Sequence, residues 1–290
     1  MRDDRATFEA LLAGPDAPRP VPTRPRRHFR ALFISDVHMG ARGCRIEALV
    51  DFLTHVSADT IYLVGDIFDS WVPIGKNWTP AHDMAVRLIL DFAEAGARIV
   101  YLPGNHDAFL RRHYGIYFGQ IEVVEQIRHR AIDGREYLVL HGDQCDIFQR
   151  KRARWISLLG AHVDSTLRGL SSLVNRVRKL LGMEDFIVIE RALLRFNSLI
   201  RYGNRFEKRL ARLAREGDFD GVICGHFHKP ALHEEFGVIY ANCGDWIDSF
   251  TAVTEARDGT LQLLRWAGVA APAAEPVDLA KAEDAPGWVA

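Results

Sequence analysis

Short apolar runs alternate with longer amphipathic segments through the first half of the organised part of the chain. Residues 30–35 (RALFIS), 60–65 (TIYLVG) and 97–104 (ARIVYLPG) are predicted strands, and residues 46–56 and 80–96 are predicted helices between them. This alternation is typical of α/β units built around a buried sheet. We therefore expect strands covered by helices in this half of the protein.

The pattern changes twice in the second half. Residues 127–142 (IRHRAIDGREYLVLHG) read as a hairpin with Asp133–Gly134 at its turn. Residues 148–216 then follow an almost wholly helical pattern, and strand signals return in residues 219–225, 237–244 and 249–266. The helical stretch therefore predicts an insertion into an α/β sandwich.

The two ends of the chain differ in composition from this unit. Residues 1–28 are rich in proline and arginine, and residues 267–290 in alanine and proline, so both are predicted to be flexible. Residues 29–266 are predicted to form one domain. Hydrophobic residues make up 48% and charged residues 26% of the chain, and the net charge of -1 gives no field that would attract nucleic acid.

Cysteine usage and hydropathy favour a cytoplasmic protein. The four cysteines are widely spaced and form no CxxC, which argues against a zinc ribbon and a disulfide framework and fits a reducing compartment. The longest apolar runs are far shorter than the ~18 residues of a membrane span.

Polar clusters follow the predicted strands where each strand ends. They contain Asp36 and His38, Asp66, the group Asn105, His106 and Asp107, His141, and finally His226 and His228. In α/β sheets, ligands gather beyond the carboxyl ends of the strands. We therefore expect these loops to converge on one site.

The donor types in these clusters fit two metal ions. Carboxylates, an amide and imidazoles without a thiolate suit Mn²⁺, Fe²⁺ or Zn²⁺ rather than a structural cysteine-zinc site. Two divalent ions about 3.5–4 Å apart need a bridging anion, and the carboxylate of Asp66 is the natural candidate. The segment 225–228 (GHFH) can present one imidazole to each metal.

In this order and spacing, D-x-H, G-D, G-N-H-D, H-G-D and G-H-x-H resemble the signature of calcineurin-like binuclear metallophosphoesterases, over residues 29–266. The resemblance implies a four-layer αββα sandwich, with a helical cap formed by the insertion. It also implies one metal held by Asp36, His38, Asp66 and His228, and a second held by Asp66, Asn105, His141 and His226. A hydroxide that bridges the two metal ions would attack phosphorus. The expected ion is Mn²⁺, and Fe²⁺ and Zn²⁺ are the other candidates. His106 would support the transition state or protonate the leaving group, oriented by Asp107.

A narrower resemblance concerns the substrate. GDIFDSW, HGDQCD and a basic helical insertion before GHFHKP are similar to the UDP-2,3-diacylglucosamine hydrolases of lipid A assembly, which release UMP and 2,3-diacylglucosamine 1-phosphate. Residues 150–181 carry eight Lys or Arg and one Asp among apolar residues. Such a basic cap is predicted to hold acyl chains or to contact the inner membrane peripherally. The chain departs from those hydrolases at His106, where they commonly have arginine.

Other functions stay open at this point. The same pair of metal ions would also catalyse hydrolysis of a soluble phosphodiester, a nucleotide or a phosphoprotein. A scaffold that binds partners through its surface would be expected to lose metal ligands, whereas every expected ligand is present. A nuclease would need an extended basic track, for which the net charge offers little support, so no nucleic-acid partner is expected.

Overall fold

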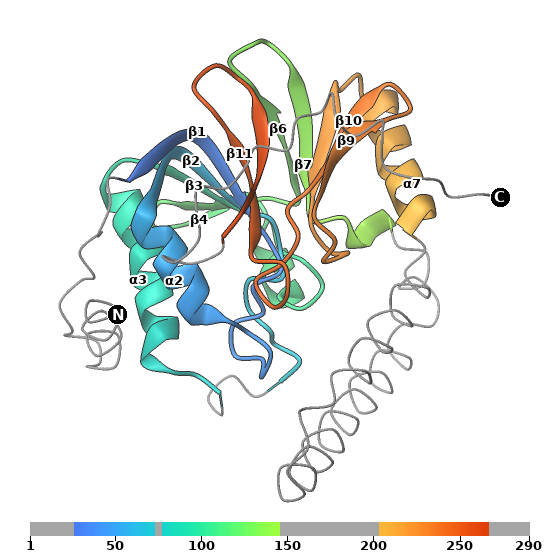
Figure 1. Cartoon of the computed structure of the whole chain (residues 1–290). Coiled ribbons are helices and arrows are strands. Elements are labelled where there is room, and N and C mark those ends of the chain that lie inside the picture. The colour runs from blue at the N-terminus through green and yellow to red at the C-terminus, as the bar shows by residue number, and fades with distance from the viewer. Residues whose placement is uncertain (1–25, 73–76, 146–202, 267–290) are drawn as a thin grey trace, which may run out of the picture. The chain divides into compact units, whose positions relative to one another are not determined.

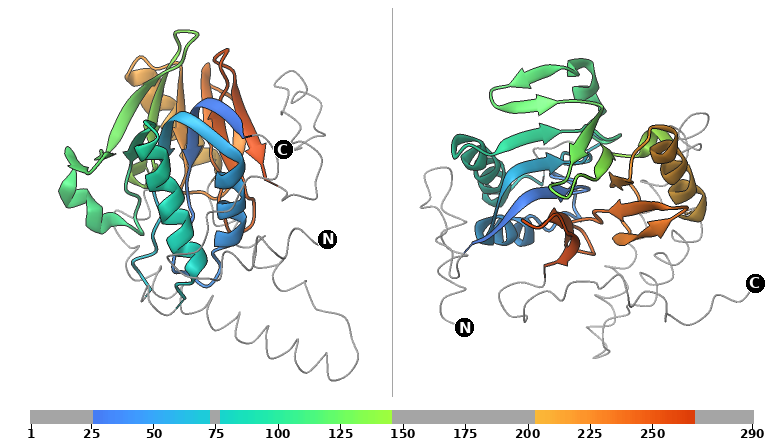
Figure 2. Two further views of the ribbon diagram at one scale, coloured as in Figure 1. Left: turned by 90° about the vertical axis from the view of Figure 1, so that its left-hand side faces the viewer. Right: turned by 90° about the horizontal axis from the view of Figure 1, so that it is seen from above.

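Two β-sheets lie face to face at the centre of the fold (Figures 1 and 2). This computed structural model of the chain describes residues 26–72, 77–145 and 203–266. The seven-stranded sheet has the order β12-β11-β1-β2-β3-β5-β4, and the five-stranded sheet the order β6-β7-β8-β10-β9. The chain divides into two units, Met1–Gly142 with Leu210–Ala290 and Asp143–Arg209, and both sheets belong to the first.

The strands of the larger sheet are β1 (Arg27–Ile34), β2 (Val56–Leu63), β3 (Arg98–Tyr101), β4 (Ile116–Phe118), β5 (Ile121–Val123), β11 (Thr251–Glu255) and β12 (Leu261–Arg265). Those of the smaller sheet are β6 (Gln126–Arg130), β7 (Glu136–Leu140), β8 (Gly221–Cys224), β9 (Ala231–Glu235) and β10 (Val238–Asn242). β1, β2, β3 and β5 pair in parallel, as do β7, β8 and β10. The carboxyl ends within each parallel set therefore lie along one edge of its sheet.

Helices cover the outer faces of both sheets. α2 (Ile46–His55) and α3 (Pro80–Glu94) lie on the seven-stranded sheet and bury apolar stripes that include Leu49, Leu53 and Leu88 (Figure 1). α3 begins with a capping box between Thr79 and His82. The helix α7 (Gly203–Glu216) belongs to the unit of the five-stranded sheet from Leu210 on, and this part of it lies beside that sheet. The resulting α/β/β/α layering is the predicted one.

Apolar side chains fill the layer between the two sheets. Phe33 and Tyr62 stack with their ring centroids 4.6 Å apart, and Val139 and Ile223 pack there from the smaller sheet. Each strand alternates between this layer and the helix-covered face, because successive side chains of a strand point to opposite faces. This packing fixes where the strands end, and so where their loops meet.

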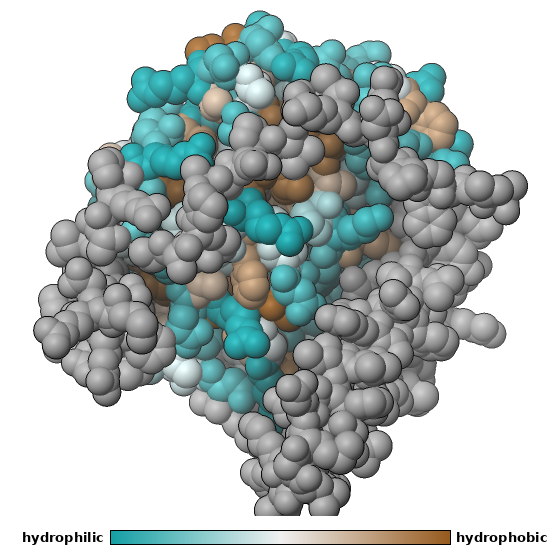
Figure 3. Space-filling model, in the orientation of Figure 1, coloured by the Kyte–Doolittle hydropathy of each residue, from teal (hydrophilic) through white to brown (hydrophobic). Residues whose placement is uncertain are grey.

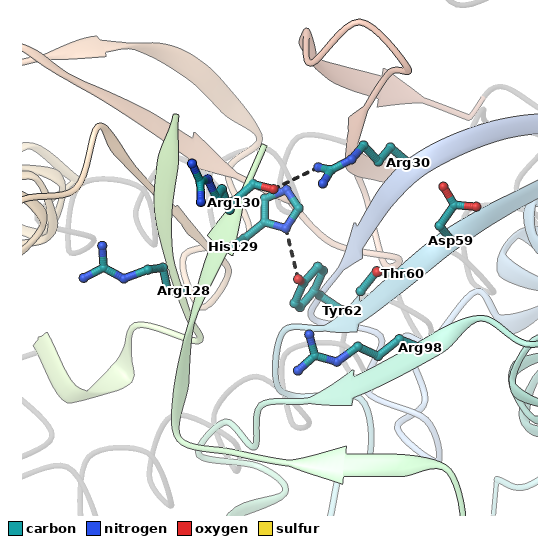
Figure 4. Close-up of a pocket in the computed structure, with 8 residues that line it drawn as sticks. All are labelled: Arg30, Asp59, Thr60, Tyr62, Arg98, Arg128, His129 and Arg130. Carbon is teal, nitrogen blue, oxygen red and sulfur yellow. Dashed lines mark hydrogen bonds between the residues drawn. The ribbon is translucent and has the colours of Figure 1, made fainter. Parts of the chain in front are cut away.

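A buried polar network joins the two sheets beside a pocket (Figure 4). His129 of β6 bonds the hydroxyl of Tyr62 at 3.0 Å and the carboxylate of Glu255 at 2.8 Å. Beside it is a pocket of about 420 Å³, lined by Arg30, Asp59, Thr60, Tyr62, Arg98, Arg128, His129 and Arg130. Glu255, Glu122 and Glu136 pair with Arg30, Arg98 and Arg128 respectively, so acids largely balance the charge around the pocket.

Two short connections add strands that the apolar pattern did not predict. β4 and β5 have three residues each, too few for a periodicity to be recognised. β9 (Ala231–Glu235) lies between the predicted strands 219–225 and 237–244, in a stretch for which no strand was predicted. The basic stretch 150–181 and the 267–290 tail lie outside the described residues, as does nearly all of the 1–28 leader. Most of the predicted cap lies outside them too, and its described part contains the helix α7.

The surface of the described part carries hydrophobic residues in several separate areas among hydrophilic ones, on the face shown in Figure 3. Large exposed apolar side chains include Trp71 after β2 and the three residues of the edge strand β4, Ile116, Tyr117 and Phe118. Among the described helices, none is both long and apolar enough to cross a membrane.

Candidate dimetal site

The predicted ligands lie in the loops after five strands. Asp36 and His38 follow β1, Asp66 follows β2, Asn105 follows β3, His141 follows β7, and His226 and His228 follow β8. Asp36, His38 and His228 form one group whose ligand atoms lie within 4.8 Å of one another, and Asp66, His141 and His226 form a second.

The two groups adjoin each other through Asp66. Its Oδ2 lies 3.4 Å from His141 Nε2 in its own group and 3.9 Å from His38 Nε2 in the other. In the first group, His228 Nε2 is 3.2 Å from Asp36 Oδ1 and 3.3 Å from His38 Nε2. A carboxylate that faces donors of both groups has the position that a bridging ligand requires.

The backbone at the site is held in an unusual conformation. Asp36, His38, Asp66, His226 and His228 all have φ between 52° and 69°, a region that non-glycine residues rarely adopt. Hydrogen bonds between the loops hold them there: Asp36 N donates to Gly65 O at 3.0 Å, and His226 N donates to Asp36 Oδ2 at 2.9 Å. Strain of this kind costs on the order of 1–3 kcal/mol per residue and gathers where function needs a fixed geometry.

Two glycines are required by close approach at the centre. A Cβ on Gly104 would collide with Asp66 Oδ1 and would lie 2.7 Å from His141 Nε2. A Cβ on Gly225 would lie 2.5 Å from Asp36 Oδ2 and 2.6 Å from Ser35. Any side chain at either position would displace the donor atoms beside it.

Unsatisfied polar atoms support the presence of cations. Asp36 Oδ1 and Asn105 Oδ1 are buried and accept no hydrogen bond. A buried acceptor left in this state costs about 1–3 kcal/mol, and a divalent ion beside it removes that cost. With imidazoles as the remaining donors, the residues fit oxygen- and nitrogen-bound divalent ions.

A family model described as calcineurin-like phosphoesterase matches residues 29–230 of the chain. The chain belongs to the calcineurin-like phosphoesterase family. This confirms the family predicted from the motifs, and with it a hydrolase of phosphate esters or diphosphates. The family is a dimetal one, and the two Asp and His groups are the candidate metal sites of this chain. The predicted α/β sandwich is confirmed as well.

Relatives of this metallophosphoesterase include UDP-2,3-diacylglucosamine hydrolases. That of Coxiella burnetii (strain Dugway 5J108-111) is 27% identical over 248 residues, covering 80% of this chain and 96% of the relative. That of Photorhabdus laumondii is 28% identical over 222 residues, covering 70% and 83%. Among solved structures, the phosphoesterase Yfce from E. coli is 11% identical, covers 84% of this chain and 99% of its own, and has a TM-score of 0.43.

The charges of the metallophosphoesterase site depend on one another. Burial disfavours the charged form of Asp66, yet His141, His38 and His106 together hold the pKa of this carboxyl well below its usual range. Burial likewise opposes protonation of His38, but a hydrogen bond to Asp69 and the charges of Asp66 and Asp36 raise its pKa. The carboxylate of Asp66 is therefore kept ionised by the imidazoles around it, as a ligand for a cation requires.

His106 lies at the edge of the two groups, and its carboxylate partner differs from the predicted one. His106 Nδ1 is 3.0 Å from Asp69 Oδ1, and the ring lies against His38 at a centroid distance of 4.5 Å. Asp69 Oδ2 is also 3.8 Å from His38 Nδ1. Asp69, which the sequence reasoning did not single out, therefore contacts a predicted ligand and the predicted catalytic histidine.

Asp107 has a different role from the one expected. Its Oδ2 accepts hydrogen bonds from Ile67 N at 2.9 Å and the Tyr101 hydroxyl at 2.5 Å, and its Oδ1 accepts from Gly104 N at 2.5 Å. Burial and the charge of Asp66 raise its pKa. The expectation that Asp107 orients His106 is corrected: Asp107 ties the loop after β3 to the loop after β2, and Asp69 bonds the ring.

A second carboxylate beside the site, Asp245, was also missed. It follows β10, which is parallel to β8, and lies 3.2 Å from His228 Nδ1. The signal was present in the sequence, because Gly244–Asp245 after a strand repeats the Gly65–Asp66 pattern.

Proposed function

We propose that this metallophosphoesterase hydrolyses the diphosphate of UDP-2,3-diacylglucosamine to UMP and 2,3-diacylglucosamine 1-phosphate. The observation that carries the proposal is the match to hydrolases of that name over most of both chains. The adjoining Asp and His groups support the proposal, because they could hold the metal ions that such a reaction needs.

The proposed metal ligands follow the two groups. One ion would be held by Asp36, His38, Asp66 and His228, and the other by Asp66, Asn105, His141 and His226. When bound, such a pair supplies a water of lowered pKa and positive charge opposite the phosphoryl oxygens. Mn²⁺ is the proposed ion, and Fe²⁺ or Zn²⁺ suit the same donors.

The chain's own residues orient the reacting groups. With Nδ1 of His106 bonded to Asp69, the nitrogen left for the substrate is Nε2. We propose that it donates a hydrogen bond to the phosphoryl group, or a proton to the departing phosphate. The stacked ring of Trp71 restricts the ring plane of His106, so this donor is held in one direction.

The substrate's acyl chains need an apolar surface. We propose that residues 150–181, outside the described residues, provide it, together with peripheral contact to anionic lipid at the cytoplasmic face of the inner membrane.

The test is UMP release from UDP-2,3-diacylglucosamine by the purified protein with Mn²⁺. Asp66→Ala should abolish release, whereas Asp59→Ala, on β2 but paired with the surface residue His28, should retain it. If the protein releases no UMP but still cleaves a small chromogenic phosphodiester, the proposed substrate is wrong and the proposed dimetal hydrolase stands. Release that is unchanged in Asp66→Ala would overturn the assigned site.

A further inference from the structure

Asp245 lies directly behind one of the proposed metal ligands. Its side chain is almost fully buried, at 3% exposure, and its Oδ2 is 3.2 Å from His228 Nδ1. The other ring nitrogen, Nε2, lies 3.2 Å from Asp36 Oδ1 and 3.3 Å from His38 Nε2. The imidazole thus extends between a carboxylate on one side and the first metal group on the other.

The two oxygens of Asp245 have separate partners. Oδ1 accepts backbone N–H groups of Ile247, Asp248 and Ser249 at 3.1, 2.8 and 2.9 Å. Oδ2 is the oxygen that faces His228. The turn is tied to the site as well, because Trp246 N donates to Asp36 O at 3.1 Å. The carboxylate is therefore held in place by its own loop and leaves one oxygen to act on the ring.

We propose that Asp245 is a positioning residue that accepts a hydrogen bond from Nδ1–H of His228, so that Nε2 is aimed into the metal group. An ionised carboxylate only accepts hydrogen bonds, so Asp245 favours a proton on Nδ1. Asp36 Oδ1 lies equally close to Nε2, and a metal ion bound between them would take the place of a proton there. Two Nε2 atoms, of His38 and His228, face each other at 3.3 Å, an arrangement that a shared cation satisfies. This inference rests on the proposed dimetal site and is independent of the substrate.

Substitution by asparagine separates the two tasks of Asp245. In Asp245→Asn, Oδ1 can still accept the N–H groups of residues 247–249, so the turn is retained. The amide NH₂ would face His228 Nδ1 as a donor, and the ring would shift its proton to Nε2. Loss of such a supporting contact typically weakens metal binding 10–100-fold. We expect a loss of that size for about one of the two Mn²⁺ equivalents.

The experiment combines Mn²⁺ titration calorimetry with ¹⁵N NMR of the histidine rings in the metal-free protein. The control is Asp258→Asn, an exposed carboxylate whose Oδ1 also accepts a backbone N–H, from Thr260 at 2.9 Å. The expected result is a proton on Nδ1 of His228 in the wild type and in the control, its loss from Nδ1 in Asp245→Asn, and weakened Mn²⁺ binding in that variant alone.

Three results would overturn the inference. They are an Nε2–H tautomer in the wild type, an unchanged tautomer in folded Asp245→Asn, and full binding of both Mn²⁺ equivalents by that variant. If Asp245→Asn fails to fold, as judged by circular dichroism, the wild-type tautomer decides alone. A wild type that binds no Mn²⁺ would refute the dimetal proposal, while the ring NMR still reports on Asp245.

Discussion

The indole of Trp71 stacks on the imidazole of His106, with ring centroids 3.7 Å apart and 25° between the planes. Both residues are tied to Asp69: Trp71 N donates to Asp69 Oδ1 at 3.0 Å, and the same oxygen is 3.0 Å from His106 Nδ1. Trp71 is 48% exposed, so its indole affects the orientation of His106 more than the stability of the core.

Trp71→Ala should lower kcat/KM of phosphoester hydrolysis roughly 2–13-fold, since an aromatic pair contributes about 0.5–1.5 kcal/mol. Trp71→Phe should keep most of the activity, because a ring still covers His106. Leu90→Ala, which removes a similarly exposed apolar side chain on α3, is the control and should change nothing. Equal rates for Trp71→Ala and wild type would show that the stack has no role in turnover.

His106→Ala should lower kcat by about 10²–10⁴, the usual contribution of a positioned acid or base. Metal content should stay at the wild-type value, because His106 is not among the proposed ligands. The measurement is steady-state kinetics beside metal analysis of the same samples. Loss of one metal equivalent on this substitution would instead make His106 a ligand, in the group His38, Asp69 and His106.

Gly104→Ala should distort the site, since the added Cβ would collide with Asp66 and crowd His141. Crowding of this kind costs about 1–3 kcal/mol, and here it should appear as weaker Mn²⁺ binding and lower activity. Gly43→Ala is the matched control, because its Cβ would meet only Ile247 Cγ2 at 3.4 Å. Calorimetry on both variants gives the comparison, and normal Mn²⁺ affinity in Gly104→Ala would contradict the crowding argument.

Glu255→Gln should reduce the free energy of unfolding by about 1.5–3 kcal/mol at pH 7, the range for hydrogen bonds to charged groups. Burial disfavours the charged form of Glu255, but His129, Ile132 N and Arg30 hold its pKa below the usual value. A lowered pKa means that this stabilisation is present above about pH 4.5 and is lost as the pH falls through the folded-state pKa.

Urea unfolding of wild type and Glu255→Gln at several pH values measures that dependence. The difference between the two proteins should shrink below about pH 4.5. Glu122→Gln is the control, because it breaks an ion pair with the 52% exposed Arg98, and such pairs contribute about 0–1 kcal/mol. If the difference in the free energy of unfolding between wild type and Glu255→Gln were the same at pH 7 and pH 3, the stabilisation could not come from the charge of Glu255.

The fold was predictable because its signals are local. Alternating apolar strands and amphipathic helices predict the layers, and Asp133–Gly134 predicts the hairpin of β6 and β7. The short strands β4 and β5 were not predictable in this way, since three residues carry no readable period and the pairing of β5 depends on β3 being in place.

The sequence by itself determined the donor types of the site and their places at strand ends, because parallel strands bring their carboxyl ends to one edge. Only the tertiary structure decided which carboxylate forms a hydrogen bond with which imidazole. Asp107 is next to His106 in the chain but bonds Tyr101, whereas Asp69, far along the chain from His106, bonds its ring. Neighbours in sequence point in different directions, and the partner of a side chain is set by how the loops pack against one another.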